Sequence, residues 1–95
     1  RYGGEEFAAV LPDTGPEQAA LHAEAIRARI AALAVTHAPA AMRAYVTMSI
    51  GVASFDKDRL CTAETMLAAA DSCLYAAKHA GRDCVIVHKL EETIA

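Results

Sequence analysis

The chain alternates between short apolar runs and longer segments in which apolar residues recur every three or four positions. Residues 7–11 form an apolar run that stops at Pro12 and Gly15, which predicts a short buried strand. A helix with one apolar face is predicted next, from Pro16 to about Ala34. The predicted apolar face contains Ala20, Leu21, Ala25, Ile26, Ile30 and Leu33. The predicted solvated face contains Gln18, His22, Glu24, Arg27 and Arg29.

The second half of the chain continues with another strand and another helix. Residues 45–55 predict a strand, because strongly apolar residues alternate there with small or polar ones. Gly51 inside this strand marks either a close approach of other atoms to the backbone or a bulge. The helix that follows is predicted to be capped by Thr62 or Thr65 and to end at Gly81. Its apolar face is predicted to contain Met66, Leu67, Ala70, Leu74 and Ala77.

Residues 84–87 predict a final apolar strand. The resulting order is strand, helix, strand, helix, strand, which predicts an α+β fold, an α/β sandwich with helices packed on a sheet. No repeat or linker interrupts this order, so residues 1–95 are predicted to belong to one domain.

The amino-acid composition limits how much apolar surface the fold can bury and which classes of partner it can bind. The chain is 55% hydrophobic and rich in alanine, with three Tyr, two Phe and no Trp, so each core residue buries little surface and stability is expected to be modest. A net charge of −3 without a basic stripe argues against a nucleic-acid partner, although a nucleotide needs only a few cations. No apolar run reaches the ~20 residues of a membrane span, and no signal peptide is expected. Three cysteines without a C-x-x-C pair predict reduced thiols and a cytoplasmic location.

The first candidate for chemistry is the glycine pair followed by two carboxylates at Gly3, Gly4, Glu5 and Glu6. Paired glycines favour a tight hairpin turn, since they accept positive φ. Adjacent side chains in a strand point to opposite faces, so the two glutamates share one site only if the turn twists them. Taken alone, the segment is better explained as a hairpin tip with solvated glutamates than as a site.

The second candidate is the end of the second predicted helix. Lys78 and Arg82 are four residues apart, and two cations there satisfy the negative end of the helix dipole. The same two cations could bind a triphosphate, one as a point charge and one as a fork of donors. Asp71, seven residues before Lys78, is interpreted as pairing with the helix surface.

Three segments resemble the motifs of GGDEF domains, the diguanylate cyclase family. Residues 1–7, Arg-Tyr-Gly-Gly-Glu-Glu-Phe, resemble the family signature in its variant with Glu at the third position. Residues 46–53 resemble the family's T-x-S-I-G-V-A strand, and residues 70–83 resemble its A-D-x-x-L-Y-x-A-K-x-x-G-R-N helix end. The motifs follow in the family's order and cover nearly the whole chain. The chain is therefore identified as the carboxyl-terminal portion of a GGDEF domain, starting at the signature.

The resemblance implies a function in bacterial signalling. GGDEF domains condense two GTP molecules into cyclic di-GMP and release two pyrophosphates, with one GTP held by each domain of a homodimer. Two Mg²⁺ or Mn²⁺ ions assist this nucleotidyl transfer. The implied metal-binding and catalytic carboxylates are Glu5, which is also the implied base, and Glu6. The implied substrate-binding residues are Gly3 and Gly4 against the nucleotide, and Lys78 and Arg82 at its terminal phosphates.

The resemblance begins only at the signature, so the amino-terminal part of a complete GGDEF domain is missing from the match. The resemblance makes the chain a partial ferredoxin-like palm without the family's first strand and helices, which carry a metal-binding Asp and the residues that read guanine. Two strands would then have bare edges, so a chain that folds alone is predicted either to rearrange or to exchange elements with a second copy. Asp83 also replaces the family's Asn after Gly-Arg. The isolated fragment is expected to be inactive even if the whole protein is a cyclase.

Two other functions fit the same sequence. A regulatory GGDEF module would bind GTP, cyclic di-GMP or a protein partner without turnover, but the intact Gly-Gly-Glu-Glu-Phe segment favours a catalytic origin. A domain used only as an interaction surface would require all three motifs to be coincidental.

Overall fold

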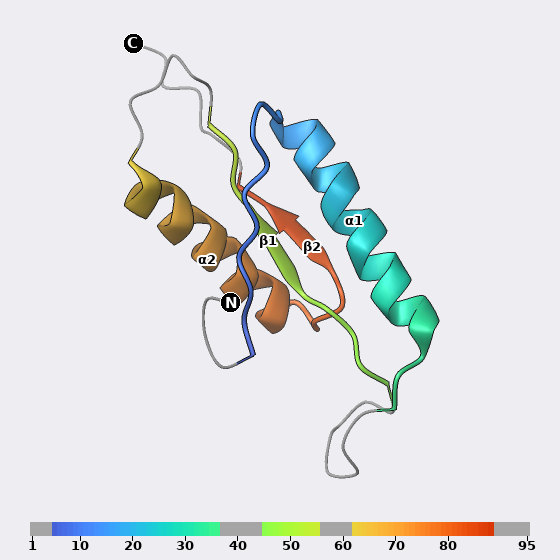
Figure 1. The fold of residues 1–95 in the computed structure, drawn as a ribbon. Helices are drawn as coiled ribbons and strands as arrows, with labels where there is room; N and C mark the ends of the chain where they lie inside the picture. Colours follow the sequence, from blue (N-terminus) through green and yellow to red (C-terminus); the bar gives the residue numbers. More distant parts are fainter. Residues whose placement is uncertain (1–4, 37–44, 56–61, 89–95) are drawn as a thin grey trace.

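Two helices and two short strands make up the computed structural model, which describes residues 5–36, 45–55 and 62–88 (Figure 1). Helix α1 spans Pro16–Leu33 and strand β1 spans Ile50–Val52. Helix α2 spans Ala63–His79 and strand β2 spans Val85–Val87. These elements confirm the α+β class predicted from the sequence.

The two strands form a parallel sheet joined by α2. Ile50 pairs with Val85, and Val52 pairs with Val87. The Ile50 N–H donates to the Cys84 carbonyl at 3.0 Å, and the His88 N–H donates to the Val52 carbonyl at 2.7 Å, so pairing extends just past the strand ends. Parallel neighbours require a crossover connection, which α2 provides here.

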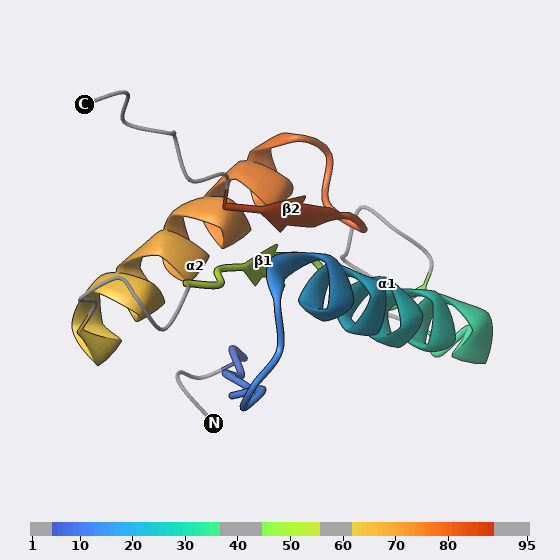
Figure 2. The same cartoon turned by 90° about the horizontal axis from the view of Figure 1, so that it is seen from above.

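The helices lie on opposite faces of this sheet, as Figure 2 shows. Ile50 and Val52 of β1, with Val85 and Val87 of β2, pack against Ala19 and Ala23 of α1. Gly51 lies between Ile50 and Val52 and therefore faces the other side of the sheet, where it meets the backbone of α2. The sheet is thus covered on both faces, α1 on one and α2 on the other.

The close approach expected at Gly51 is confirmed. A Cβ atom built on Gly51 would lie 2.9 Å from the carbonyl carbon of Cys73, and closer still to the Ala70 carbonyl oxygen and the Leu74 nitrogen. Glycine therefore allows α2 to rest directly on β1. At this position, the small residue of the predicted alternation therefore reflects a closely packed helix.

The predicted strand over residues 7–11 does not form a strand in the described structure. The segment crosses in front of β1 in Figure 1 without pairing to a strand, and Phe7 and Val10 are 69% and 87% exposed. An extended apolar run becomes a strand only when its N–H and C=O groups find a neighbouring strand. Within the described ranges, residues 7–11 are not part of a strand, so their apolar composition alone was not sufficient.

The predicted strand over residues 45–55 is shorter than its alternation suggested. Only three of its residues form β1, because its partner β2 is equally short. Tyr45, at its start, instead makes an isolated antiparallel bridge to Thr36. The last predicted strand, residues 84–87, is confirmed to within one residue as β2.

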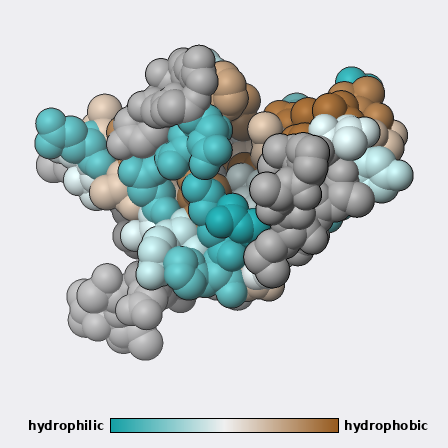
Figure 3. Space-filling model, turned by 90° about the horizontal axis from the view of Figure 1, so that it is seen from below, coloured by the Kyte–Doolittle hydropathy of each residue, from teal (hydrophilic) through white to brown (hydrophobic). Residues whose placement is uncertain are grey.

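Helix α1 has the predicted length, but its buried face is rotated from the predicted one. Ala19 and Ala23 are buried, whereas Leu21, Ile26 and Leu33 are 65%, 49% and 66% exposed. Seen from below, hydrophobic surface gathers over the carboxyl half of this helix (Figure 3). Small alanines let α1 approach the sheet closely, so large apolar residues were a poor guide to its buried side.

Helix α2 begins and ends with recognisable caps. The Thr65 N–H donates to the Thr62 Oγ1 at 3.1 Å, so Thr62 is the N-cap of the two candidates that the sequence offered. At the other end, Gly81 has a φ of 112° and the Arg82 N–H donates to the Ala77 carbonyl at 3.0 Å. This bond and the left-handed glycine correspond to a Schellman motif, which confirms that Gly81 terminates the helix.

The Thr62 cap gives a direct test of the α2 boundary. Thr62→Ala is expected to lower the free energy of unfolding by about 1 kcal/mol, since it leaves the Thr65 N–H without its acceptor. Urea unfolding followed by circular dichroism measures the change. Thr62→Ser keeps the hydroxyl and should retain most of the stability. Equal losses in both variants would show that the hydroxyl does not cap the helix.

In the part of the chain that the structure describes, neither helix is both long and apolar enough to cross a membrane.

Candidate functional site

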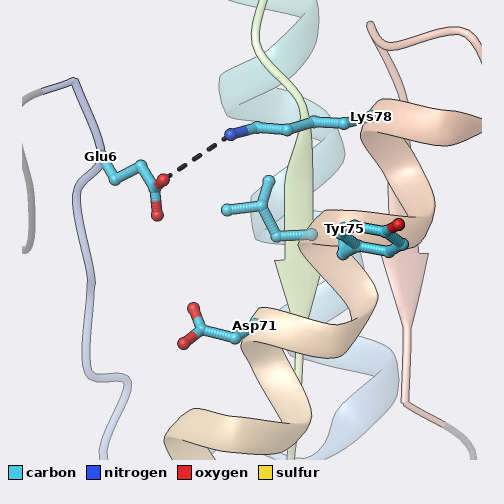
Figure 4. A pocket seen from close by; sticks show the side chains of 5 residues that line it. Glu6, Asp71, Tyr75 and Lys78 are labelled. Atoms are coloured by element: carbon cyan, nitrogen blue, oxygen red, sulfur yellow. Dashed lines mark ion pairs between the residues drawn. The ribbon is translucent and has the colours of Figure 1, made fainter.

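A shallow pocket of about 190 Å³ lies between the amino-terminal segment and α2. Glu6 stands on one side, and on the other α2 contributes Asp71, Leu74, Tyr75 and Lys78 (Figure 4). The Lys78 Nζ lies 3.6 Å from the Glu6 Oε2, so the two form an ion pair across the pocket mouth. The structure therefore brings together one residue from each of the two candidate motifs.

Helical periodicity explains why α2 contributes four residues to this pocket. Positions 74, 75 and 78 lie three, four and seven residues after position 71, which places all four on one face over two turns. Figure 4 shows Asp71 and Lys78 extending from α2 on the side where Glu6 lies. Asp71 was interpreted only as a surface residue of the helix, although its spacing from Lys78 was sufficient to predict a shared face.

Tyr75 is the most exposed side chain of this group. It is 66% exposed, and its ring stacks on His79 with the ring centroids 4.0 Å apart. The His79 Nδ1 is also 2.9 Å from the Tyr75 carbonyl oxygen, so the imidazole is held against the helix end. The pocket rim next to Lys78 therefore presents an aromatic surface as well as a cation.

Of the signature residues that the structure describes, Glu6 is the one that lines this pocket. Glu5 is exposed and lies at a bend, next to Glu6 in the chain. Gly3 and Gly4, the predicted nucleotide-facing glycines, lie outside the described residues. The hairpin predicted for the glycine pair lies outside the described residues for the same reason.

Arg82 lies three residues beyond the last helical residue, His79. Its backbone is left-handed, with a φ of 64°, and its side chain is exposed. The four-residue spacing from Lys78 therefore does not place it on the same helical face. Of the described residues that line the pocket, Lys78 is the one cation, and Arg82 is not among them.

A second charged cluster lies at the same end of the molecule and was not predicted. Arg27 of α1 donates from Nη1 to the Asp83 Oδ1 at 2.8 Å and from Nε to both oxygens of Glu24 at 2.9 and 3.0 Å. The hydrogen bonds from Arg27 hold the pKa of the Glu24 carboxyl below its usual value. Arg27 was predicted to lie on the solvated face of α1, whereas its side chain is partly buried and bonds to Asp83, 56 positions away.

The carboxylates of Glu5 and Glu6 suit a hard divalent cation such as Mg²⁺ only if a phosphate supplies further ligands. Within the described ranges no three acidic, histidine or cysteine side chains group as metal ligands. Glu5 and Glu6 supply carboxylate oxygens, the ligand type that hard cations prefer. Mg²⁺ commonly binds through one or two carboxylates plus substrate phosphates, so these residues fit a nucleotide-bound metal rather than a protein cage.

Comparison with known proteins, by family model and by individual relatives, shows what the chain is similar to. A family model described as diguanylate cyclase, GGDEF domain, matches residues 1–84. Response regulator PleD of Caulobacter vibrioides is 40% identical over 86 residues, which are 90% of this chain and 19% of that protein. Diguanylate cyclase A of Treponema denticola is 37% identical over 89 residues, which are 94% of this chain and 23% of that protein. The chain thus spans about a fifth of the length of these relatives. No solved structure matches it.

Proposed function

Because this chain belongs to the GGDEF domain family of diguanylate cyclases, we propose that it supplies the phosphate- and metal-binding part of a site that condenses two GTP molecules into cyclic di-GMP. The activity would be that of the full-length protein. Two copies would each hold one GTP, and the 3′-hydroxyl of one nucleotide would attack the α-phosphorus of the other, releasing pyrophosphate.

The observation that best supports this proposal is the pairing of Glu6 with Lys78 across an open pocket. An acidic and a basic group 3.6 Å apart at the pocket mouth offer both an oxygen ligand for a cation and a cation for a phosphate. Neither side chain is deeply buried, so the pair opens at low cost when a more highly charged ligand enters.

Each proposed site residue has a separate task. Lys78 and Arg82 would bind the terminal phosphates, Lys78 from within the helix and Arg82 from the turn after it. Gly3 and Gly4 would leave room for the nucleotide next to the backbone. Glu5 would accept the proton of the attacking hydroxyl, and Glu6 would share with Glu5 the binding of the metal.

Mg²⁺ or Mn²⁺, when bound by these carboxylates and the phosphates, would stabilise the charge that develops on the leaving pyrophosphate. The protein residues would then orient the phosphate chain and hold the carboxylate next to the hydroxyl that is to be deprotonated. Positioning of this kind accounts for a large part of catalysis in transfers of phosphoryl-type groups.

The test of this proposal is product formation by the full-length protein. Incubation with GTP and Mg²⁺ is expected to yield cyclic di-GMP and pyrophosphate, detected by chromatography. Addition of EDTA is expected to lower the rate by about a hundredfold or more, since the metal contributes several kcal/mol to charge stabilisation. Excess Mg²⁺ added after EDTA is the control and should restore the rate. GTP binding without any product in Mg²⁺ or Mn²⁺ would instead support the regulatory module.

A further inference from the structure

The turn that leaves α2 adopts a backbone conformation that two of its residues do not favour. Gly81, Arg82 and Asp83 have φ angles of 112°, 64° and 48°. Glycine adopts positive φ without steric cost, whereas arginine and aspartate in this region are strained, aspartate the less so. Strained turns persist only where the surrounding contacts fix them, and such turns are frequent at functional sites.

Contacts from three parts of the chain fix this turn. The Arg82 N–H donates to the Ala77 carbonyl of α2 at 3.0 Å. The Asp83 N–H donates to the Ser49 Oγ, next to β1, at 3.2 Å. The Asp83 carboxylate accepts from the Arg27 Nη1 of α1 at 2.8 Å. Asp83 is therefore held through its backbone on one side and through its side chain on the other.

Arg27 reaches the turn from the opposite layer of the fold. It lies on α1, which covers the other face of the sheet from α2 (Figure 2). Its Nε bonds both oxygens of Glu24, three residues earlier on the same helix, which fixes the plane of the guanidinium. The group is thus oriented before it meets Asp83, and little side-chain freedom is lost in that contact.

We propose that Arg27 is a positioning residue for nucleotide binding. By holding Asp83, it fixes the strained turn and so sets where Arg82 stands relative to Lys78 at the carboxyl end of α2. The contact of Arg82 with a phosphate rests on the function proposed above. The bond by which Arg27 fixes the turn does not depend on that function. Arg27 would act through Arg82 and would not contact the nucleotide itself.

Steady-state kinetics of the full-length protein with Mg²⁺ and GTP tests the coupling between the two arginines. Arg82→Met is expected to raise KM for GTP about tenfold through loss of a charge-assisted contact. Arg27→Met is expected to raise KM about fivefold with kcat little changed, since the displaced group binds substrate. The double variant should match Arg82→Met alone, because Arg27 has nothing left to position. Arg29→Met, which removes an exposed arginine from the same helix, should leave KM unchanged.

Two kinetic outcomes would overturn the proposal. One is that the effects of Arg27→Met and Arg82→Met multiply in the double variant, which would mean that they act independently. The other is that Arg27→Met, like Arg29→Met, leaves KM for GTP unchanged.

Amide hydrogen exchange separates this proposal from the proposed function. In Arg27→Met, the amides of Arg82 and Asp83 are expected to exchange several-fold faster, because their bonds depend on the fixed turn. Unchanged protection would overturn the positioning role whatever the protein does with GTP. If exchange is faster in Arg27→Met but Arg82→Met leaves KM unchanged, Arg27 fixes the turn and Arg82 is not a phosphate ligand.

Discussion

Replacing Gly51 by alanine is expected to lower the free energy of unfolding by about 3 kcal/mol or more, a large share of the 5–15 kcal/mol typical of a domain. The added Cβ would lie 2.9 Å from the Cys73 carbonyl carbon and even closer to backbone atoms of Ala70 and Leu74. These are atoms of a helix backbone rather than the ends of flexible side chains. Relief of the clash therefore requires all of α2 to move away from β1.

That movement would reach the candidate site as well as the core. Lys78 and Asp71 belong to the helix that has to shift, so the pocket next to Glu6 would change together with the packing. Urea unfolding of the 95-residue chain, followed by far-ultraviolet circular dichroism, measures the loss. Gly15→Ala is the matched control, because a Cβ at Gly15 meets nothing within 4 Å. A stability for Gly51→Ala equal to that of Gly15→Ala would contradict the close contact.

Changing Glu5 to glutamine is expected to lower kcat for cyclic di-GMP formation by the full-length protein by about a hundredfold or more. Glutamine keeps the size of the side chain but neither accepts the proton of a hydroxyl nor offers a charged oxygen to a metal. Because Glu5 is exposed at a bend in the structure, the substitution should leave the fold intact. Affinity for GTP should fall less than kcat, since Lys78 and Arg82, the proposed phosphate-binding residues, are unchanged.

The rate of pyrophosphate release and the affinity for GTP, measured on the same preparation, separate these effects. Glu17→Gln is a suitable control, because Glu17 is an exposed carboxylate in the first turn of α1. If Glu5→Gln turned over GTP as fast as the parent, Glu5 would have no catalytic role. If both proteins bound GTP equally and neither released pyrophosphate, the regulatory function would be the better description.

Local patterns predicted the helices well because the signals for helix boundaries are local. Pro16 at the first turn of α1, the Thr62 cap and the left-handed Gly81 each depend on a few neighbouring residues, and each lies where the sequence predicted. Gly51 was also informative, since a glycine inside a strand indicates that something approaches closely. What approaches it, the backbone of α2, could not be known from the strand alone.

Features that depend on distant partners could not be predicted in the same way. Residues 7–11 have the composition of a strand, but a strand needs a neighbour that the pattern does not specify. The buried side of α1 was misjudged because Ala19 and Ala23, rather than the larger residues, face the sheet. Arg27 was predicted to be exposed, because its partner Asp83 lies 56 positions away and the helix pattern gives no sign of it.

The candidate site was predicted partly from pattern and partly from resemblance. The spacing of Asp71, Tyr75 and Lys78 already places them on one face of α2. That Glu6 meets this face follows neither from periodicity nor from charge, because 72 positions separate Glu6 from Lys78. The roles proposed for the six site residues remain predictions, and the kinetic variants test those of Glu5 and Arg82.

The small size of the buried side chains determines how the chain responds to heat and denaturant. The buried apolar residues of the described structure are Ala19, Ala23, Val52, Cys73 and Ala77, and none of its large side chains is fully buried. Unfolding therefore hydrates little new apolar surface, which is the quantity that sets both the heat-capacity increment and the denaturant m-value. Both should be low for a chain of this length. The curve of stability against temperature is then shallow, and unfolding spreads over a wide range of temperature rather than occurring sharply at one midpoint.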